Sequence, residues 1–281
     1  MVKLQNVLFE YGKGKPLFSG LNLTLEPGNI YGLLGKNGAG KTTLLKIIAG
    51  LRYATDGNCQ VLGYDPKKRL PSMLQDIFFI PEAPVVPKMS IKEYTYYYAS
   101  FYPGFDHSAH AKYLAELGID PTELFHKLSH GQQKKAMLSF AFATNCRLLI
   151  LDEPTNGLDI PSKAQVRKLL ASLSAENRTI IISTHQVRDL ENIIDPIVIL
   201  DNGRVIFNHS MAEISQRLTM QIAAAQPDPV SAIYSEKTVG GYAVISANTT
   251  GVENAIDIEV LFNAVTAFPR EIENIFAKVR Q

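Results

Sequence analysis

The stretch GKNGAGKT at residues 35–42 constrains this chain more than any other part of its sequence. It lies between a short apolar run, NIYGLL (29–34), and a helical pattern, KTTLLKIIAGL (41–51). A glycine-rich loop between a buried strand and a helix lets backbone N–H groups surround phosphates, and the N-terminus of the helix favours negative charge. In such a loop the lysine reaches the β and γ phosphates, and the hydroxyl after it binds magnesium. The sequence therefore predicts a phosphate-binding loop for ATP or GTP.

We expect the nucleotide contacts to come from this loop and from one aromatic residue before it. Tyr11 has two interpretations, since it could stack on the base of the nucleotide or be an exposed loop tyrosine. The hydroxyl of Thr42 is the expected magnesium ligand. The predicted ATP-binding residues are Tyr11, Gly35, Lys36, Asn37, Gly38, Ala39, Gly40, Lys41, Thr42 and Thr43.

Short, continuous apolar runs recur along the first 210 residues. Runs of this length suit strands that are buried on both faces, which is typical of a mainly parallel sheet in an α/β protein. The last run is broken by Asp201-Asn202-Gly203, a hairpin signal that predicts antiparallel strands at the end of this unit. The runs are 29–34, 76–80, 148–152, 179–184 and 196–207.

The strand signal disappears between residues 89 and 145, where the pattern predicts an inserted helical subdomain. Residues 90–102 and 107–118 are expected helices, and Gly118 with Pro121 just beyond it ends the second. Four aromatic residues recur at helical spacing in the first of these helices. Core packing is the favoured interpretation over ligand contact for this stripe, which comprises Tyr94, Tyr97, Tyr98 and Phe101.

The sequence pattern changes after residue 210 and there predicts a small α+β accessory domain. We expect two domains, an α/β core (1–210) and this appendage (211–281). The appendage should contain a helix, a hairpin and a final helix, at 211–226, around Gly240-Gly241 and at 257–268.

Composition excludes several classes of function. The apolar fraction of 46% suffices for an ordinary globular core. The net charge is +1, and because residues 211–281 carry five basic and eight acidic side chains, the preceding 210 residues carry +4. Neither part has the strong basic excess of a nucleic-acid-binding protein, so we expect no nucleic-acid partner.

Cysteine usage and hydropathy indicate where the protein works. Cys59 and Cys146 lie far apart without CxxC or histidine-rich surroundings, so we expect reduced, buried thiols rather than a metal or redox site. The N-terminus has no apolar leader segment, and no apolar run approaches the ~18 residues needed to span a bilayer. We therefore expect a soluble, cytoplasmic protein, with any membrane-spanning part supplied by another chain.

Two adjacent carboxylates follow the run LLILD. Asp152 and Glu153 come at the carboxyl end of a buried strand, the edge where open α/β sheets bind ligands. One interpretation is a helix-capping pair. With a phosphate loop upstream, the favoured interpretation is that Asp152 holds magnesium, through water, and that Glu153 polarises the attacking water.

A histidine ends the next apolar run. His185 follows 179–184 and should therefore lie on the same edge of the sheet. A lone histidine is usually a surface or core residue with its hydrogen bonds satisfied. At the tip of a third functional strand, contact with the γ-phosphate is the favoured interpretation.

A second helix start with anion-binding character occurs in LSHGQQKK (128–135). Ser129 is placed to cap the helix, and Gly131 leaves the backbone open to a bulky anion. Since GKNGAGKT already forms a complete phosphate loop, this second element needs a separate explanation.

In order, the motifs GKNGAGKT, LSHGQ, LLILDEP, NGLD and STH resemble those of the ATP-binding cassette (ABC) ATPases. The chain looks like the nucleotide-binding subunit of an ABC transporter over roughly residues 2–210. The resemblance implies a P-loop ATPase core, magnesium with ATP, catalysis by Glu153 and a γ-phosphate contact from His185. It also implies that Asp159 communicates across a dimer and that Ser129, Gly131 and Gln132 act on the ATP of a partner subunit. LSHGQ would then complete the site of another chain.

This sequence departs from the family pattern at two positions. His130 stands where the family usually has glycine, and a backbone role there predicts little effect. Glu82 stands in the segment where the family places a glutamine that touches magnesium. One hypothesis is that Glu82 reaches the metal when magnesium–ATP is bound. The alternative is that it points to solvent from a loop stiffened by Pro81, Pro84 and Pro87.

The expected function is ATP hydrolysis by a subunit that dimerises around ATP and drives a separately encoded membrane permease. A homodimer is expected and a heterodimer is the alternative. The end of the chain resembles the C-terminal extension of ATPases of drug, lipid and polysaccharide exporters, which favours export, although it could also shield an edge of the core. The protein would lie at the inner face of the cell membrane through its permease. A soluble ABC ATPase without transport is the alternative function, and a non-catalytic binding module is disfavoured by Glu153 and His185.

Overall fold

A central sheet carries the predicted phosphate loop and the polar strand ends. The computed structural model describes residues 1–12, 14–173, 178–228 and 232–277. The sheet has six strands in the order β5-β6-β7-β3-β8-β9, and only the pairing of β8 with β9 is antiparallel. The strands confirm the five apolar runs and the hairpin: β3 (Ile30–Leu34), β5 (Ile77–Ile80), β6 (Leu148–Asp152), β7 (Thr179–Thr184), β8 (Ile197–Asp201) and β9 (Arg204–His209).

The sheet is buried on both faces, and β6 shows why its sequence is continuously apolar. Successive side chains of a strand point to opposite faces. Leu149 and Leu151 pack into a core shared with helices α5 (His130–Ala143) and α6 (Ile160–Ser172). Leu148 and Ile150 pack into a second core with helix α1 (Lys41–Ile48). Two cores on the two faces of one sheet therefore fix the polar residues at its carboxyl edge.

A second sheet, antiparallel and three-stranded, covers the α1 side. It has the order β2-β1-β4, formed by β1 (Val2–Phe9), β2 (Phe18–Leu25) and β4 (Asp56–Val61). The short helix α2 (Pro71–Leu74) precedes β5. These strands are not among the predicted elements, although buried and exposed residues alternate in β2 from Leu21 to Leu25.

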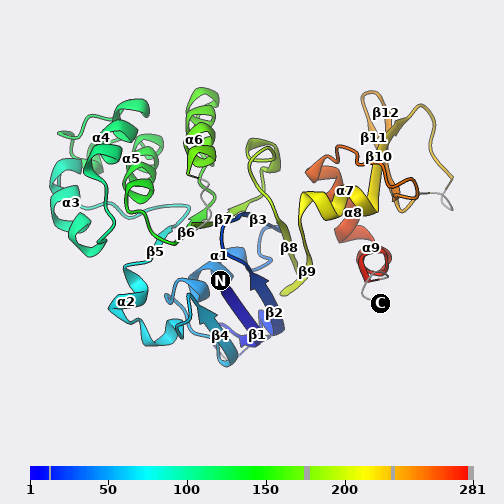
Figure 1. Cartoon of the computed structure of the whole chain (residues 1–281), viewed down its shortest axis with the longest axis horizontal. Helices are drawn as coiled ribbons and strands as arrows, with labels where there is room; N and C mark the ends of the chain where they lie inside the picture. Colours follow the sequence, from blue (N-terminus) through cyan, green and yellow to red (C-terminus); the bar gives the residue numbers. More distant parts are fainter. Residues whose placement is uncertain (13, 174–177, 229–231, 278–281) are drawn as a thin grey trace.

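The predicted subdomain between residues 89 and 145 is helical in the described structure. Its helices are α3 (Ile91–Tyr98), α4 (His107–Glu116) and α5, and Figure 1 shows them together on one side of the central sheet. The expectation that the aromatic stripe packs in the core is wrong for most of its members. Tyr94 is buried and stacks on Tyr98 with ring centroids 4.4 Å apart, but Tyr97 and Phe101 are 58% and 65% exposed. Tyr97 lies within α3 and Phe101 lies beyond its end, so a helical spacing alone does not place a side chain in the core.

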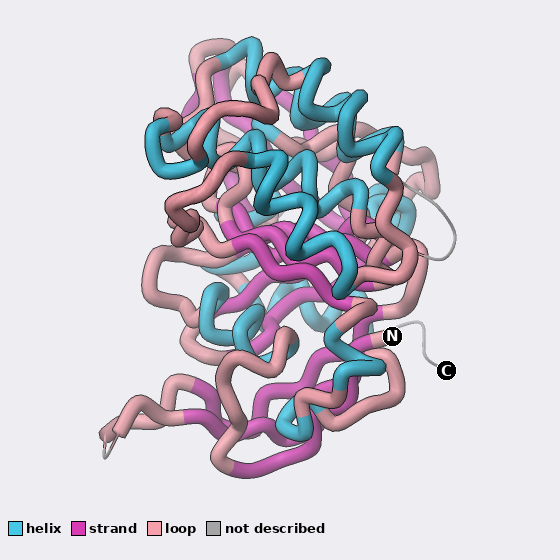
Figure 2. Tube along the Cα trace, turned by 90° about the vertical axis from the view of Figure 1, so that its left-hand side faces the viewer, coloured by secondary structure: helices cyan, strands magenta, loops and turns pink. Residues whose placement is uncertain are grey.

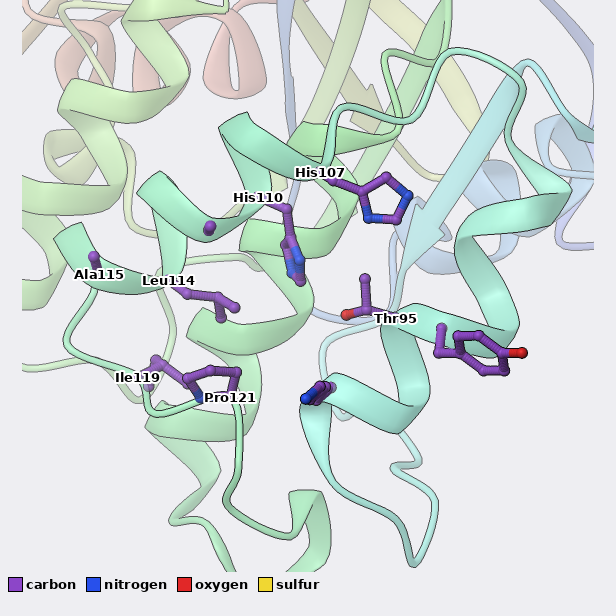
Figure 3. A pocket seen from close by; sticks show the side chains of 10 residues that line it. Thr95, His107, His110, Leu114, Ala115, Ile119 and Pro121 are labelled. Carbon is purple, nitrogen blue, oxygen red and sulfur yellow. The ribbon is translucent and has the colours of Figure 1, made fainter.

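A groove of about 390 Å³ lies between α3 and α4 in this subdomain. Figure 3 shows the His110 side chain projecting from α4 into the space beside Thr95 of α3. His110 is buried, and its Nε2 has no hydrogen-bond partner in the described structure. Burial, with a smaller effect of His107, lowers the pKa of His110 to about 4, so its ring is neutral at physiological pH.

The C-terminal part corrects one expectation. Residues 211–226 do not form one helix, because α7 ends after seven residues and the chain continues as a strand that pairs with β12. Leu218, Met220 and Ile222 alternate along this strand, a period-2 pattern that fits a strand better than a helix. The elements are α7 (Met211–Arg217), β10 (Leu218–Ala223), β11 (Tyr234–Thr238), β12 (Gly241–Ala247), α8 (Ile258–Ala267) and α9 (Pro269–Ala277).

The hairpin and the helix within 257–268 are confirmed, and α9 is an addition. The sheet has the order β10-β12-β11, with α8 buried against it through Leu261 and Val265. Figure 1 places these elements on the side of the central sheet opposite to the helical subdomain, and Figure 2 shows strands running through the middle of the molecule. The division into domains at residue 210 stays a prediction.

Two further expectations concern cysteines and membrane segments. Cys59 and Cys146 are buried free thiols, as expected. Burial raises the pKa of Cys59 to about 12 and that of Cys146 to about 11. Within the described ranges, no helix has the length and apolar character required to cross a bilayer.

Candidate active site

The loop at residues 35–42 joins β3 to α1 with a backbone that only glycine accepts at Gly40. Gly40 has φ +106° and is the N-cap of α1, and a Cβ there would lie 2.7 Å from the ring of Phe18. A Cβ on Gly35 would lie 2.5 Å from the Leu200 carbonyl oxygen. Lys41 is buried, and its Nζ donates to the Gly35 carbonyl oxygen at 2.7 Å. The loop thus curls around its own lysine at the start of a helix.

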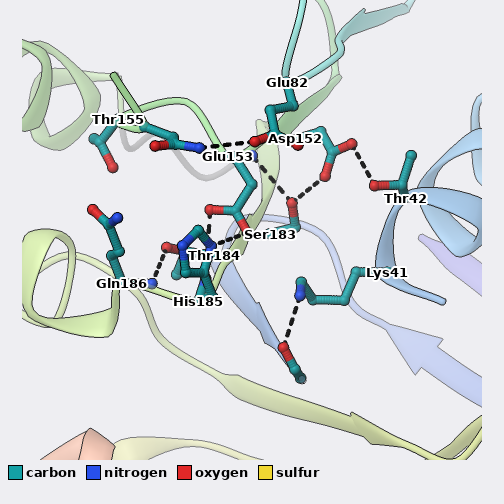
Figure 4. Close-up of polar contacts among 12 residues, drawn as sticks. Lys41, Thr42, Glu82, Asp152, Glu153, Thr155, Ser183, Thr184, His185 and Gln186 are labelled. Atoms are coloured by element: carbon teal, nitrogen blue, oxygen red, sulfur yellow. Dashed lines mark hydrogen bonds and ion pairs between the residues drawn. The ribbon is translucent and has the colours of Figure 1, made fainter. Parts of the chain in front are cut away.

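Thr42, Asp152 and Ser183 are linked in a chain of hydrogen bonds (Figure 4). The Thr42 hydroxyl donates to Asp152 Oδ2 at 2.7 Å, and Ser183 Oγ donates to Oδ1 at 2.5 Å. Asp152 and Ser183 are register partners of the parallel β6–β7 pair. Asp152 is 2% exposed, and these hydroxyls orient its carboxylate toward the phosphate loop.

Glu153 has a strained backbone and a fully engaged carboxylate. Its φ is +50°, a left-handed conformation that costs a non-glycine residue roughly 1–2 kcal/mol. Its backbone N–H donates to the carbonyl of Ser183 at 3.1 Å and to the Ser183 hydroxyl at 3.2 Å. Its Oε1 lies 2.8 Å from His185 Nδ1, and the backbone N–H of His185 donates to Oε2 at 3.4 Å. The structure therefore brings together the two residues predicted to be catalytic.

A cavity of about 360 Å³ collects most of the predicted nucleotide site. It is lined by the phosphate loop and the strand-end carboxylates: Tyr11, Leu17, Lys36, Asn37, Gly38, Gly40, Lys41, Thr42, Thr43, Glu82, Asp152 and Glu153. Burial lowers the pKa of Lys41, and the negative charges of Glu153, Asp152 and Glu82 oppose that shift. A cation facing three carboxylates can hold a polyphosphate together with a divalent metal.

Tyr11 lies beside the phosphate loop, where its ring is available for stacking. Its hydroxyl forms a 2.7 Å hydrogen bond with the hydroxyl of Thr43, and the residue is 56% exposed. Phe9 supports it edge-on with centroids 4.9 Å apart, and the Arg52 guanidinium lies 5.7 Å from its centroid. An adjoining cavity of about 480 Å³ continues from Tyr11 toward Asp201 and Gly203.

Glu82 points toward the nucleotide cavity rather than only to solvent. It lines this cavity, and its Oε1 accepts a 2.8 Å hydrogen bond from Asn156 Nδ2 (Figure 4). It also lines a second cavity of about 250 Å³ together with Gly131 and Lys134. Glu82 therefore lies between the phosphate loop and the start of α5.

The LSHGQ segment lies outside the nucleotide cavity of its own chain. Ser129 is exposed and caps α5 in a capping box, in which Gln132 N–H donates to Ser129 Oγ at 3.3 Å. Gln132 Oε1 accepts from the Ser129 N–H at 3.0 Å. Asp159 is also exposed and caps α6 by accepting from the Ser162 N–H at 2.9 Å. These contacts give both residues a local structural role, and their roles across a dimer stay predictions.

Sequence reasoning missed three residues at this edge of the sheet. Ser183 begins the STH motif, in which only His185 is predicted to have a role, and the structure pairs Ser183 with Asp152 across β6 and β7. Asn156 follows LLILDEP and binds Glu82. Lys134 on α5 is 5% exposed and donates to the carbonyl oxygens of Glu153 at 3.0 Å and Asn156 at 2.8 Å. Burial lowers the pKa of Lys134, opposed by Glu82, Glu153 and Asp152.

Comparison with known proteins places this site in a family. Residues 18–156 match the family model described as ABC transporter. The chain is 33% identical to the ABC transporter ATP-binding protein YtrB of Bacillus subtilis over 68% of this chain and 65% of YtrB. It is 31% identical to the bacitracin transport ATP-binding protein BcrA of Enterococcus faecalis over 77% and 71% of the two chains. It is also 31% identical to the linearmycin resistance ATP-binding protein LnrL of Bacillus subtilis over 78% and 72%.

The solved structures agree with these relatives. A structure titled as the ATP binding subunit of an ABC transporter superposes with a TM-score of 0.69 at 26% identity, covering 76% of this chain and 91% of that one. Two observations support the family assignment. The chain covers more than two thirds of BcrA and of LnrL, and the phosphate loop lies beside Asp152 and Glu153 in one site. The chain therefore belongs to the ABC transporter family, as an ATP-hydrolysing nucleotide-binding subunit.

Proposed function

We propose that this protein dimerises around two ATP molecules and that the cycle of ATP hydrolysis drives a separate membrane permease that exports its substrate. One observation carries the proposal. The phosphate loop, Asp152 and Glu153 share one cavity, whereas Ser129 is exposed outside that cavity. A site whose γ-phosphate cage lacks the LSHGQ element in its own chain is completed by a second copy.

In this proposal the residues of the cavity divide the chemistry among themselves. The phosphate-loop N–H groups and Lys41 bind the β and γ phosphates, and Tyr11 stacks on the base. Glu153 accepts a proton from the attacking water, and His185, held by Glu153 at 2.8 Å, contacts the γ-phosphate. The positive φ of Glu153 fixes where its side chain leaves the backbone, so the carboxylate is oriented before the nucleotide binds.

The donor atoms in the cavity fit a magnesium ion. Mg²⁺ prefers oxygen ligands and is usually held by one or two carboxylates together with substrate phosphates. The Thr42 hydroxyl and the Asp152 carboxylate already lie 2.7 Å apart, and Glu82 lines the same cavity. No group of three or more His, Cys, Asp or Glu side chains suited to a metal occurs in the described part of the chain. Thr42, Asp152 and Glu82 would therefore hold the ion jointly with ATP, and the ion would neutralise charge developing on the phosphates.

The N-terminus of α5 supplies what the second subunit contributes. Ser129 caps the helix, so its hydroxyl and the N–H of Gly131 lie at the positive end of the helix dipole. Together with Gln132 they would bind the γ-phosphate held by the other subunit, as donors aimed at developing charge. Asp159 lies at the start of α6, where it would sense the partner across the interface. A homodimer then holds two complete sites.

Export is supported by the names of the relatives, which include bacitracin transport and linearmycin resistance proteins. The permease is proposed as a separate integral membrane chain, with this subunit held at the cytoplasmic face of the cell membrane through it. The proposal is tested by co-purifying the protein with its membrane partner and measuring ATP hydrolysis in liposomes. We expect hydrolysis to rise when the transported compound is added. Hydrolysis without any associated membrane chain would instead support a soluble ATPase that does not transport.

A further inference from the structure

Lys134 is a buried cation for which the proposed chemistry gives no role. It lies on α5, is 5% exposed, and places its Nζ 3.0 Å from the carbonyl oxygen of Glu153 and 2.8 Å from that of Asn156. A buried ammonium group loses its hydration and requires hydrogen-bond partners in exchange. Both described partners are backbone oxygens of one short segment, 153–156. The lysine is therefore a clamp on that segment.

The clamped segment is a turn that begins at the predicted catalytic carboxylate. The N–H of Asn156 donates to the Glu153 carbonyl oxygen at 3.3 Å and closes the turn. On the other side, the N–H of Glu153 is held by Ser183 at the end of β7. The positive φ of Glu153 persists only where surrounding contacts hold it. Lys134 on α5 and Ser183 on β7 supply these contacts from two different elements.

Lys134 also links this turn to the first turns of α5. It lies three residues after Gly131, so the two residues share a helix face. Gly131 packs against the same loop, because a Cβ there would meet Leu158 Cδ2 at 3.5 Å and the Gly157 carbonyl oxygen at 3.6 Å. A displacement of the α5 N-terminus is therefore passed to residues 153–158 through direct contacts.

We propose that Lys134 is a positioning residue that couples the position of α5 to the carboxylate of Glu153. When Ser129 and Gly131 contact the nucleotide of the second subunit, Lys134 holds the Glu153 turn in its reactive geometry. Each subunit would then hydrolyse its own ATP only while its α5 rests on the ATP of the other. This inference rests on the proposed function, because it requires α5 to face the second nucleotide.

The test replaces Lys134 by methionine, an unbranched side chain that is one atom shorter and lacks the charge and the donors. We expect kcat for magnesium–ATP to fall at least about 10-fold while KM stays within about 3-fold of the parent, since the change acts on orientation rather than on binding. Lys134→Arg, which keeps a buried donor cation, should restore most of kcat. Lys112→Met removes an exposed lysine of the same subdomain and should match the parent.

A double-mutant cycle separates positioning from general damage. If Lys134 acts through Glu153, then Lys134→Met should cause little further loss in a Glu153→Gln background, measured by single-turnover hydrolysis of labelled ATP. The inference is wrong if the losses of the two single variants multiply in the double variant. It is also wrong if Lys134→Met keeps the kcat of the parent. A crystal structure of Lys134→Met should show the 153–156 turn displaced, and an unmoved turn would contradict the clamp.

Two further outcomes are distinguished by the same set of proteins. If the parent does not dimerise with ATP and Lys134→Met still loses kcat, the proposed dimer is wrong, and Lys134 positions Glu153 within one chain without coupling it to a partner. If Lys134→Met does not fold, Lys134→Gln, which keeps a shorter, neutral amide donor group and removes the charge, carries the same expectation. Thermal unfolding of each variant identifies a fall in kcat that reflects lost folded protein.

Discussion

Glu153 and His185 are 32 residues apart in the sequence, yet Glu153 Oε1 lies 2.8 Å from His185 Nδ1. They meet because β6 and β7 are parallel neighbours that end on the same edge of the sheet. The contact orients the imidazole ring and restricts the rotation of the carboxylate. The two groups therefore act as one unit, and truncating either side chain is expected to disturb the other.

Removing the charge of Glu153 should abolish turnover without abolishing binding. Glu153→Gln keeps the shape and the contact with His185, but an amide cannot accept the proton of the attacking water. We expect kcat to fall by about 10²–10⁴-fold with ATP affinity retained. The variant should also accumulate as an ATP-bound dimer in size-exclusion chromatography. Near-parental turnover would show that Glu153 is not the general base.

Ser129→Arg should prevent ATP-driven dimerisation and leave ATP binding to the monomer within a few-fold of the parent. The arginine would place a bulky cation where the second subunit's γ-phosphate is proposed to lie. Ser90→Arg is the matched control, because Ser90 caps α3 in a capping box of the same type. Both changes remove a helix cap worth about 1 kcal/mol. Dimerisation of Ser129→Arg at the parental ATP concentration would contradict the composite site.

Glu82→Gln should change the magnesium dependence of ATP hydrolysis. An ionised carboxylate in the nucleotide cavity repels free ATP unless magnesium offsets its charge, whereas a carboxamide is neutral. We expect the variant to bind free ATP more tightly than the parent and to need a different magnesium concentration for half-maximal hydrolysis. Glu116→Gln, which removes an exposed carboxylate of α4, is the control. Identical magnesium titrations for Glu82→Gln and the parent would remove Glu82 from the metal site.

The buried imidazole of His110 should make the protein less stable in acid. Its folded-state pKa of about 4 lies below the ordinary value of 6.5, so the unfolded chain binds more protons between these values. The stability contributed by the neutral ring is present above pH 6.5 and is lost as the pH falls toward 4. Over this pH range the free energy of unfolding falls by at most about 3 kcal/mol through this group. Urea unfolding of His110→Leu should show a weaker pH dependence than the parent between pH 6.5 and 4. His126→Leu, which removes an exposed histidine, should show the same pH dependence of unfolding as the parent. If His110→Leu also shows the pH dependence of the parent, this role of His110 is wrong.

Much of the sheet was predictable because each strand is buried on both faces. A strand such as β6 must then be continuously apolar, and it stops being apolar where it reaches the ligand edge at Asp152. The phosphate loop was predictable for a related reason, since its glycines and Lys41 follow a local rule. Both signals lie within a few consecutive residues.

The features that sequence reasoning missed depend on contacts between distant segments. Lys134 has the same chemistry as its neighbour Lys135, and only the packing of α5 against residues 153–158 makes it a buried cation. The sequence predicts a helix where β10 lies because its apolar residues follow α7 directly, and only the pairing of β10 with β12 makes it a strand. Tyr97 and Phe101 recur at helical spacing, but no other part of the described structure buries them.

The register of β6 against β7 places Asp152 beside Ser183 on a single rung of the ladder. Side chains alternate between the faces of a sheet, so a slip of one residue would carry Asp152 to the opposite face and away from Thr42. Insertions or deletions within these two strands are therefore forbidden in a way that substitutions are not. Loop lengths between the strands can drift over evolutionary time, while the spacing from each strand to its polar end must stay fixed. The pairing of β6 with β7 therefore keeps the reacting groups aligned.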